Sequence, residues 1–214
     1  MNVRLFLMVG CVAGMCAACT HKGAGSNTDN QIVVHTLILE ADSLMRSDSL
    51  FWNTPVDRAH PRVCIHDALI REKLDSAIAL CPNKQTYLLK YTYLLRSWRL
   101  PEVLSLLREM DACMRDSMSA DLLSLKAVLE DYQGDSVVAR KDFLRADSAY
   151  GVKVQEVAQD SLMYGFVRLE KALNFSLMKN DFRVLQEEIT FYERVNGKAV
   201  HGMEQWKNLT DKRA

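Results

Sequence analysis

Apolar residues recur at helical spacing along the chain from residue 31 onward. In one long stripe, Leu162, Phe166, Leu169, Leu173 and Leu177 follow one another at steps of three or four residues. Because an α-helix turns once every ~3.6 residues, this spacing places the apolar side chains on one face of an amphipathic helix. Stripes of this kind predict helices over residues 31–47, 64–81, 84–98, 101–115, 119–132, 136–150, 156–178 and 181–195, with a short one over 201–210.

Residues that interrupt helices stand between these stripes. They are Pro55, Pro61, Pro82 with Asn83, Pro101, Gly134, Asn180 and Gly197. Residues 48–62 form the one long connection for which no helix is expected. Only nine glycines and four prolines occur in 214 residues, and no strand pattern competes. The chain is therefore predicted to be all-α.

The predicted helices pair, and the pairs repeat. The origins Ile65, Trp98, Gly134 and Asn180 stand 33, 36 and 46 residues apart. Five, nine and twelve residues after each origin stands an apolar residue: Ile70, Leu74 and Ala77; Val103, Leu107 and Met110; Ala139, Phe143 and Ala146; Leu185, Ile189 and Tyr192. One helical hairpin cannot bury its apolar face alone, so such units are expected to stack on one another.

The pattern resembles the tetratricopeptide repeat, most closely at Gly134-Asp135 with Ala139, Phe143 and Ala146, and at Ala77–Asn83, where a second helix would end. The resemblance covers about residues 64–195 and implies a short α-solenoid with three to four degenerate repeats. It also implies a groove, formed by first helices, that binds a peptide or another protein. The family's groove positions fall on Gln85, Thr92, Arg96, Asp121, Ser124, Asp131, Glu170 and Asn174. An irregular helical bundle with a merely solvated polar face is the alternative.

The N-terminus has the pattern of an export signal. Arg4 precedes 14 uncharged residues, Leu5–Ala18, too few for the ~20 that a membrane-spanning helix needs. Ala17-Ala18-Cys19 then resembles the processing site of a bacterial lipoprotein, in which the cysteine is lipidated, although Cys16 stands where that signal usually has leucine. We expect a signal peptide over 1–18, a polar tether over 19–30, an N-terminal helix and long connection over 31–63, a repeat domain over 64–197, and a short helix and tail over 198–214. A plain secreted protein, or one with an uncleaved anchor, is the alternative.

Charge and motifs narrow the choice of function. Lys and Arg equal Asp and Glu at 27 each, so no electrostatic reason points to nucleic acid or to an anionic membrane as a partner. No zinc-protease, nucleophile-elbow or phosphate-loop motif occurs, and carboxylates are spread over helix surfaces. His60, Cys64 and His66 are the closest approach to a metal cluster but lack a fourth ligand. We expect no catalytic site, no metal and no cofactor. Cys64, Cys81 and Cys113 would remain in the mature chain, where three thiols cannot all pair.

The pair Asp-Ser occurs seven times, each time followed by Leu, Ala, Met or Val. Asp and Ser favour helix N-termini, which gives the pattern a structural explanation. The motif also resembles the O-glycosylation acceptor of periplasmic proteins of Bacteroidetes, for which Ser49 and Ser117 are the best candidates because both fall between predicted helices.

We expect a protein-binding or scaffolding module anchored by lipid in the cell envelope, at the outer membrane and facing the periplasm. A helical bundle that binds a small ligand or glycan, and an envelope enzyme with an unrecognised site, are the alternatives.

Overall fold

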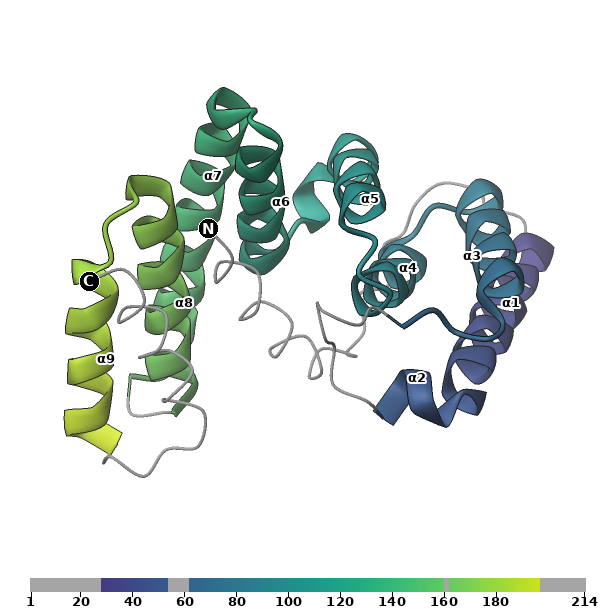
Figure 1. The fold of residues 1–214 in the computed structure, drawn as a ribbon, viewed down its shortest axis with the longest axis horizontal. Coiled ribbons are helices and arrows are strands. Elements are labelled where there is room, and N and C mark those ends of the chain that lie inside the picture. Colours follow the sequence, from purple (N-terminus) through teal and green to yellow (C-terminus); the bar gives the residue numbers. More distant parts are fainter. Residues whose placement is uncertain (1–27, 54–61, 160–161, 197–214) are drawn as a thin grey trace. The chain divides into compact units, whose positions relative to one another are not determined.

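The computed structural model describes residues 28–53, 62–159 and 162–196, which form helices and short connections without a strand (Figure 1). The elements are α1 (Thr28–Ser47), α2 (Ser49–Asn53), α3 (Asp67–Leu80), α4 (Lys84–Arg96), α5 (Leu100–Cys113), the short 3₁₀ helix η2 (Arg115–Ser117), α6 (Ala120–Gln133), α7 (Ser136–Glu156), α8 (Leu162–Lys179) and α9 (Arg183–Asn196). The predicted all-α class is confirmed.

Two compact units make up the chain, and each is described by itself. The N-terminal unit comprises the described residues up to Ser117, and the C-terminal unit comprises those from Met118 onward. Eight of the predicted helices are present, six of them within three residues of both expected ends. The predicted helix over 201–210 lies outside the described residues.

The structure differs from the prediction at one additional helix and at two helix boundaries. Residues 48–62 were expected to lack helix, but α2 lies within them. A helix of five residues is too short to show a periodic stripe, and it begins because the carboxylate of Asp48 accepts the Phe51 N–H at 3.0 Å. In addition, α7 continues six residues past the predicted end at Tyr150. Helix α8 begins at Leu162 rather than at residue 156 because Val157, in an extended conformation, ends α7.

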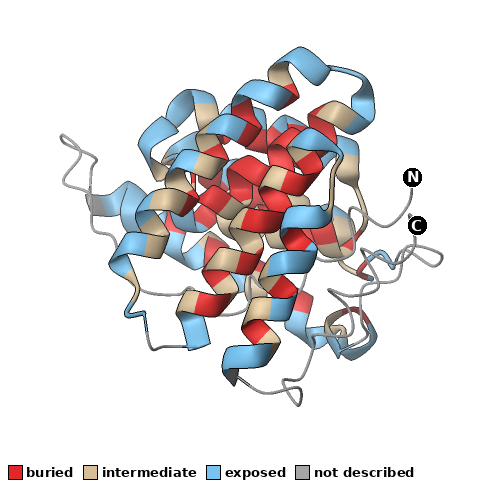
Figure 2. Ribbon diagram, turned by 90° about the vertical axis from the view of Figure 1, so that its left-hand side faces the viewer, coloured by how far each residue is buried: buried red, intermediate tan, exposed pale blue. Residues whose placement is uncertain are grey.

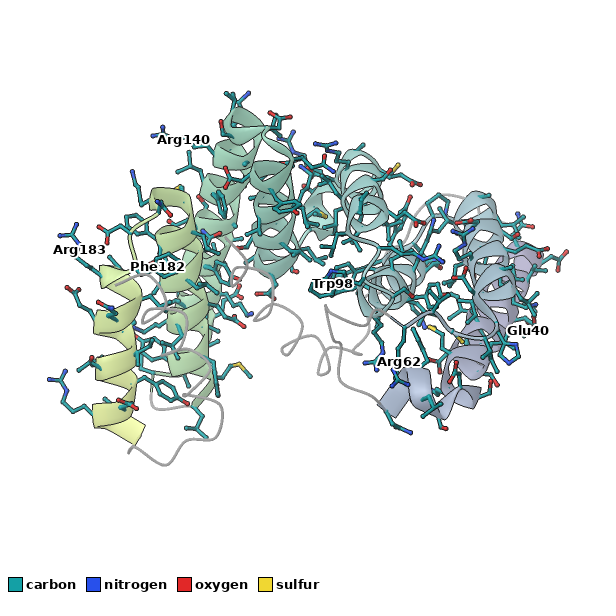
Figure 3. All side chains as sticks on the ribbon, viewed as in Figure 1. Glu40, Arg62, Trp98, Arg140, Phe182 and Arg183 are labelled. Carbon is teal, nitrogen blue, oxygen red and sulfur yellow. The ribbon has the colours of Figure 1, made fainter. Side chains whose placement is uncertain are left out.

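Three helix–helix connections share one backbone geometry. Trp98, Gly134 and Asn180 have φ angles of 55°, 94° and 54°, in the left-handed region. Each donates its N–H to the carbonyl three residues before it, and the next residue donates to the carbonyl five residues before itself: Arg99 to Leu94, Asp135 to Glu130 and Asp181 to Ser176. This is the Schellman arrangement that ends a helix and reverses the chain. Figure 3 labels Trp98 after α4 and Phe182 where α9 is about to begin.

All twelve positions of the predicted register are buried. The residues five, nine and twelve places after the four origins are each no more than 4% exposed. The origin Ile65 differs from the others, because it is 77% exposed and does not adopt a left-handed backbone. The first pair therefore lacks the tight turn, and its helices α1 and α3 are joined instead by the long connection that contains α2.

Each unit has the same pattern of helix contacts. In the N-terminal unit α1 packs on α3, α4 packs on both, and α5 packs on α4. In the C-terminal unit α6 packs on α7, α8 packs on both, and α9 packs on α8. A core of Leu169, Leu173, Phe143, Leu185 and Ile189 joins α7, α8 and α9. Buried positions lie on the sides of helices that face other helices, with exposed ones opposite (Figure 2).

Candidate functional site

The predicted groove residues of the C-terminal unit divide into two groups. Ser124 and Asn174 are fully buried, which corrects the expectation that they face a partner. Ser124 lies in α6, where every residue from Leu122 to Glu130 is buried. Asn174 is turned into the packing between α7 and α8, where its Nδ2 donates to the Phe143 carbonyl at 3.0 Å. Asp131 is half-buried near the end of α6.

Asp121 and Glu170, by contrast, meet at a lysine. Lys153 Nζ lies 3.6 Å from Asp121 Oδ2 and 3.3 Å from Glu170 Oε2. The Tyr150 hydroxyl donates to Asp121 Oδ1 at 2.8 Å, and Lys153 Nζ is 5.9 Å from the centre of the Tyr150 ring. We call Asp121, Tyr150, Lys153 and Glu170 the Lys153 cluster. Its members come from three helices of one unit.

Local helix geometry brings this cluster together. Asp121 stands in the first turn of α6, after the N-cap Ser119, where the helix dipole favours a carboxylate. Tyr150 and Lys153 are three residues apart on α7, so they share a face. Glu170 stands in α8, which packs on both α6 and α7. The ammonium of Lys153 therefore joins three packed helices: α6 near its start, α7 near its end and α8 at its middle.

The Lys153 cluster presents fixed charges at a partly open surface. Burial lowers the pKa of Lys153, but the neighbouring Asp121 and Glu170 carboxylates outweigh that effect and leave its pKa raised. Lys153 therefore stays protonated at physiological pH and is unsuited to exchanging protons. The side chains of Asp121, Lys153 and Glu170 keep 31%, 25% and 15% exposure. Two carboxylates sharing one cation retain acceptor capacity for a polar or basic group of a partner.

Sequence reasoning missed half of this cluster. Lys153 falls beyond the predicted end of the helix over 136–150, so it was not placed on any face. The spacing of Phe143, Ala146 and Tyr150 already pointed to another helical turn, since Tyr150 follows Ala146 by four residues. Gly151 follows Tyr150 directly, and glycine lowers helix stability without ending a helix.

A second set of charges is buried deeper in the same unit. Lys126 Nζ contacts Asp142 Oδ2 and lies 3.3 Å from Glu130 Oε1, and Arg145 Nη1 lies 2.8 Å from Asp142 Oδ1. The side chains of Lys126, Glu130 and Asp142 are at most 6% exposed. Burial raises the pKa of Glu130, with Lys126 acting in the opposite direction. We call these four residues the buried charge cluster. Its burial assigns it to the packing of α6 on α7 rather than to binding.

In the N-terminal unit the predicted groove residues lie on α4. Gln85 is exposed in its first turn. Thr92 is half-buried, and its hydroxyl donates to the Leu88 carbonyl at 2.9 Å. Arg96 Nη2 donates to the carbonyls of Phe51, at 2.8 Å, and of Trp52. Arg96 is thus already bound to α2 of the same chain.

The Asp-Ser pairs show both capping and exposure. Asp48 and Asp135 each accept an N–H three residues on, at 3.0 and 3.4 Å, and so cap α2 and α7. Ser49 is exposed in the first turn of α2, and Ser117 is half-buried at the end of η2. Helix capping therefore explains the pairs Asp48-Ser49 and Asp135-Ser136.

Other candidates from the sequence are placed as follows. Cys19 and His60 lie outside the described residues. Cys64 is buried, Cys81 half-buried and Cys113 exposed, all as free thiols. Over the described ranges no three His, Cys, Asp or Glu side chains gather as metal ligands would. Within those same ranges no helix has the length and hydropathy needed to cross a membrane.

Over its described ranges the structure thus defines an all-α protein. Comparisons with models of protein families, with curated proteins and with solved structures found no match.

Proposed function

We propose that this chain is a lipid-anchored protein of the cell envelope that binds or scaffolds another envelope protein through stacked, tetratricopeptide-like helical hairpins. The observation that carries this proposal is the shared geometry of the hairpins. Three connections have the same left-handed turn and hydrogen bonds, and all twelve positions of the register are buried. Stacked hairpins of this kind present extended surfaces, which suit the binding of another protein.

The surface of the first helices supports a binding role. In each unit one first helix packs on the other, as α4 does on α1 and α8 on α6. Their outward residues include the exposed Gln85 on α4 and the partly open Asp121 and Glu170 of the Lys153 cluster. Polar groups held in place by packed helices lose little freedom on binding, which favours recognition of a partner.

Lipid attachment at Cys19 is proposed from the sequence. The uncharged run Leu5–Ala18 ends in Ala17-Ala18 directly before that cysteine. A single acyl chain binds membranes marginally, whereas two or more give stable anchoring. We expect wild type to fractionate with membranes in a host that processes lipoproteins, and Cys19→Ala to be released. Cys113→Ala, at an exposed thiol, is the control and should behave as wild type. A Cys19→Ala variant that stays in the membrane fraction contradicts the anchor.

The binding role is tested by cross-linking in the native host. A photoreactive residue at Gln85, on a first helix, should give a discrete cross-linked species with an envelope protein. The same residue at Glu72 on α3 or Glu187 on α9, both exposed on second helices, should give far less. Equal yields at all three positions, or none at Gln85, contradict the proposal.

The Lys153 cluster offers a second test, by charge alone. Glu170→Gln keeps the shape of the side chain and removes one of the two carboxylates that share Lys153. We expect it to weaken capture of the partner identified through Gln85. Glu187→Gln, which alters an exposed carboxylate on α9, is the matched control. Equal capture by both variants would exclude the cluster from the binding surface.

A further inference from the structure

Helix α2 does not belong to the repeating hairpins. It lies in the connection between α1 and α3, a place where the other pairs have only a tight turn. It has five residues, whereas an isolated helix needs about 12–15 residues to persist in water. Its helical form therefore depends on the surface against which it rests, and the contacts with that surface decide whether it stays.

Phe51 and Arg96 fix α2 against α4. The Phe51 side chain is 3% exposed, and its ring lies 5.6 Å from that of Tyr93, at 47°. Arg96 donates to the carbonyls of Phe51 and Trp52. These carbonyls belong to the last turn of α2, and the carbonyls in the last turn of a helix generally take partners from outside the helix. The guanidinium thus caps the helix at the end that attracts a cation.

Two arginines lie over the Trp52 ring. The guanidinium carbon of Arg46, on α1, is 4.6 Å from a Trp52 ring centre, and that of Arg96 is 5.1 Å away. Arg46 is itself oriented by Asp42 at 2.7 Å. Arg96 also lies 5.6 Å from the centre of the Phe51 ring. We call Arg46, Tyr93 and Arg96 the Arg96 face. It recognises aromatic rings and helix-terminal carbonyls together.

We propose that the Arg96 face is a binding site for a short helix that carries two adjacent aromatic residues at its C-terminal end, and that α2 occupies this site in cis. A partner of that chemistry would displace α2. The inference rests on the proposed function, because α1 and α4 are first helices and Arg96 is a groove position of the predicted repeats. The seated α2 itself shows which ligand fits the face.

Competition in cis sets the expected strength of binding. Because α2 is tethered to the face, its effective concentration is high, and an external helix must compete with it. Asp48 strengthens the tether: its Oδ1 accepts the Phe51 N–H at 3.0 Å and its Oδ2 the Ile65 N–H at 3.1 Å. One carboxylate thus joins the start of α2 to the segment before α3. Removing the two aromatic side chains of α2 should open the site.

Binding of a fluorescent peptide comprising residues 46–55 of this chain tests the proposal. We expect the double variant Phe51→Ser/Trp52→Ser of the full chain to bind it at least about tenfold more tightly than wild type does. Adding Arg96→Gln should abolish that gain. Adding Arg140→Gln, at an exposed arginine of α7 that Figure 3 labels, should leave it unchanged. Equal affinity of wild type and the double variant, or a gain that survives Arg96→Gln, overturns the proposal.

Amide hydrogen exchange gives a second readout that does not require the double variant to fold. In the wild-type chain, saturating peptide should expose the amides of residues 49–53 to exchange, and Arg96→Gln should do so without peptide. Protection of α2 as strong as that of α4 under both conditions would make α2 a permanent part of the fold and overturn the site. Failure of cross-linking at Gln85 would count against the proposed function without changing either of these results.

Discussion

The two units have the same pattern of helix contacts but place their charges at different depths. In the N-terminal unit Asp67 accepts from the Tyr93 hydroxyl and lies 2.8 Å from Arg99 Nη2. Arg99 Nη1 lies 3.4 Å from Glu102 Oε1. The side chains of Asp67, Arg99 and Glu102 are 23%, 21% and 48% exposed. In the C-terminal unit Lys126, Glu130 and Asp142 are at most 6% exposed. The same packing scheme therefore tolerates very different electrostatic environments.

The difference follows from α6. This helix is covered on all sides from Leu122 to Glu130, so any charge on it must be neutralised inside the protein. Lys126 and Glu130, four residues apart, meet on one face, and Asp142 from α7 completes the arrangement. Taking such ions out of water costs several kcal/mol each, which their mutual attraction only roughly offsets. Depth therefore makes these residues far more sensitive to loss of a partner than those around Asp67.

Breaking the buried charge cluster should have the largest effect. Asp142→Ala leaves Lys126 and Arg145 without this carboxylate, and removing one partner of a buried ion pair costs ~3–5 kcal/mol. Glu102→Ala in the N-terminal unit removes a half-exposed partner and should cost at most ~1 kcal/mol. Urea unfolding of each variant measures the difference. Similar losses for the two would mean that depth does not distinguish the units.

Overpacking a helix contact should have the next largest effect. Ala139 is 1% exposed and stands five residues after the turn residue Gly134, so Ala139→Phe should cost ~1–3 kcal/mol. Ala112→Phe, on the exposed side of α5, provides the matched control and should change stability little. An unchanged melting temperature for Ala139→Phe would argue against the register.

The shared turns should respond in opposite directions to substitution. Gly134 has a φ of 94° with nothing within 4 Å of an added Cβ, so Gly134→Ala should cost ~1–2 kcal/mol through backbone strain alone. Asn180 is exposed with a φ of 54°, and Asn180→Gly relieves strain that asparagine partly tolerates, a gain below ~1 kcal/mol. Thermal unfolding of both variants tests the signs. A stabilising Gly134→Ala would contradict the left-handed turn.

The smallest effect concerns α2 and pH. Hydrogen bonds from the Phe51 and Ile65 amides lower the pKa of Asp48 from its ordinary value of 3.8. A carboxyl with a lowered folded-state pKa contributes stability that is complete above 3.8 and is lost as the pH falls through the lower value. We therefore expect the Phe51 and Ile65 amide resonances to shift only below about pH 4. Asp48→Asn should abolish this titration, and a midpoint above 3.8 would contradict the two hydrogen bonds.

Much of the fold could be predicted because the apolar residues that recur at helical spacing are the residues that the structure buries. The stripes located eight helices and all twelve buried positions of the register, since these depend on local spacing. Helix α2 could not be located, because its order depends on Tyr93 and Arg96, which are more than 40 residues away in sequence. The buried charges of α6 were also missed. Lys126 and Glu130 look solvated in a helix whose burial comes from packing that no local pattern reveals.

The candidate site was predicted only in part, for a related reason. Asp121 and Glu170 were chosen by family position and do meet, but Lys153, which joins them, required knowledge of how far α7 extends. Ser124 and Asn174 were also chosen because they fall on groove positions of the family, but both are buried. Polar residues at helical spacing therefore identify one face of a helix, but they do not show whether another helix covers that face.

We infer that the hairpins repeat on the register of Trp98, Gly134 and Asn180, and backbone NMR is the measurement that tests this repeat. We expect left-handed chemical shifts and scalar couplings at all three residues, with slowly exchanging amides at Arg99, Asp135 and Asp181, whose N–H groups donate to Leu94, Glu130 and Ser176. Right-handed helical values at Trp98 or Asn180 would mean that the helix continues through that position, and the repeating hairpins would be refuted.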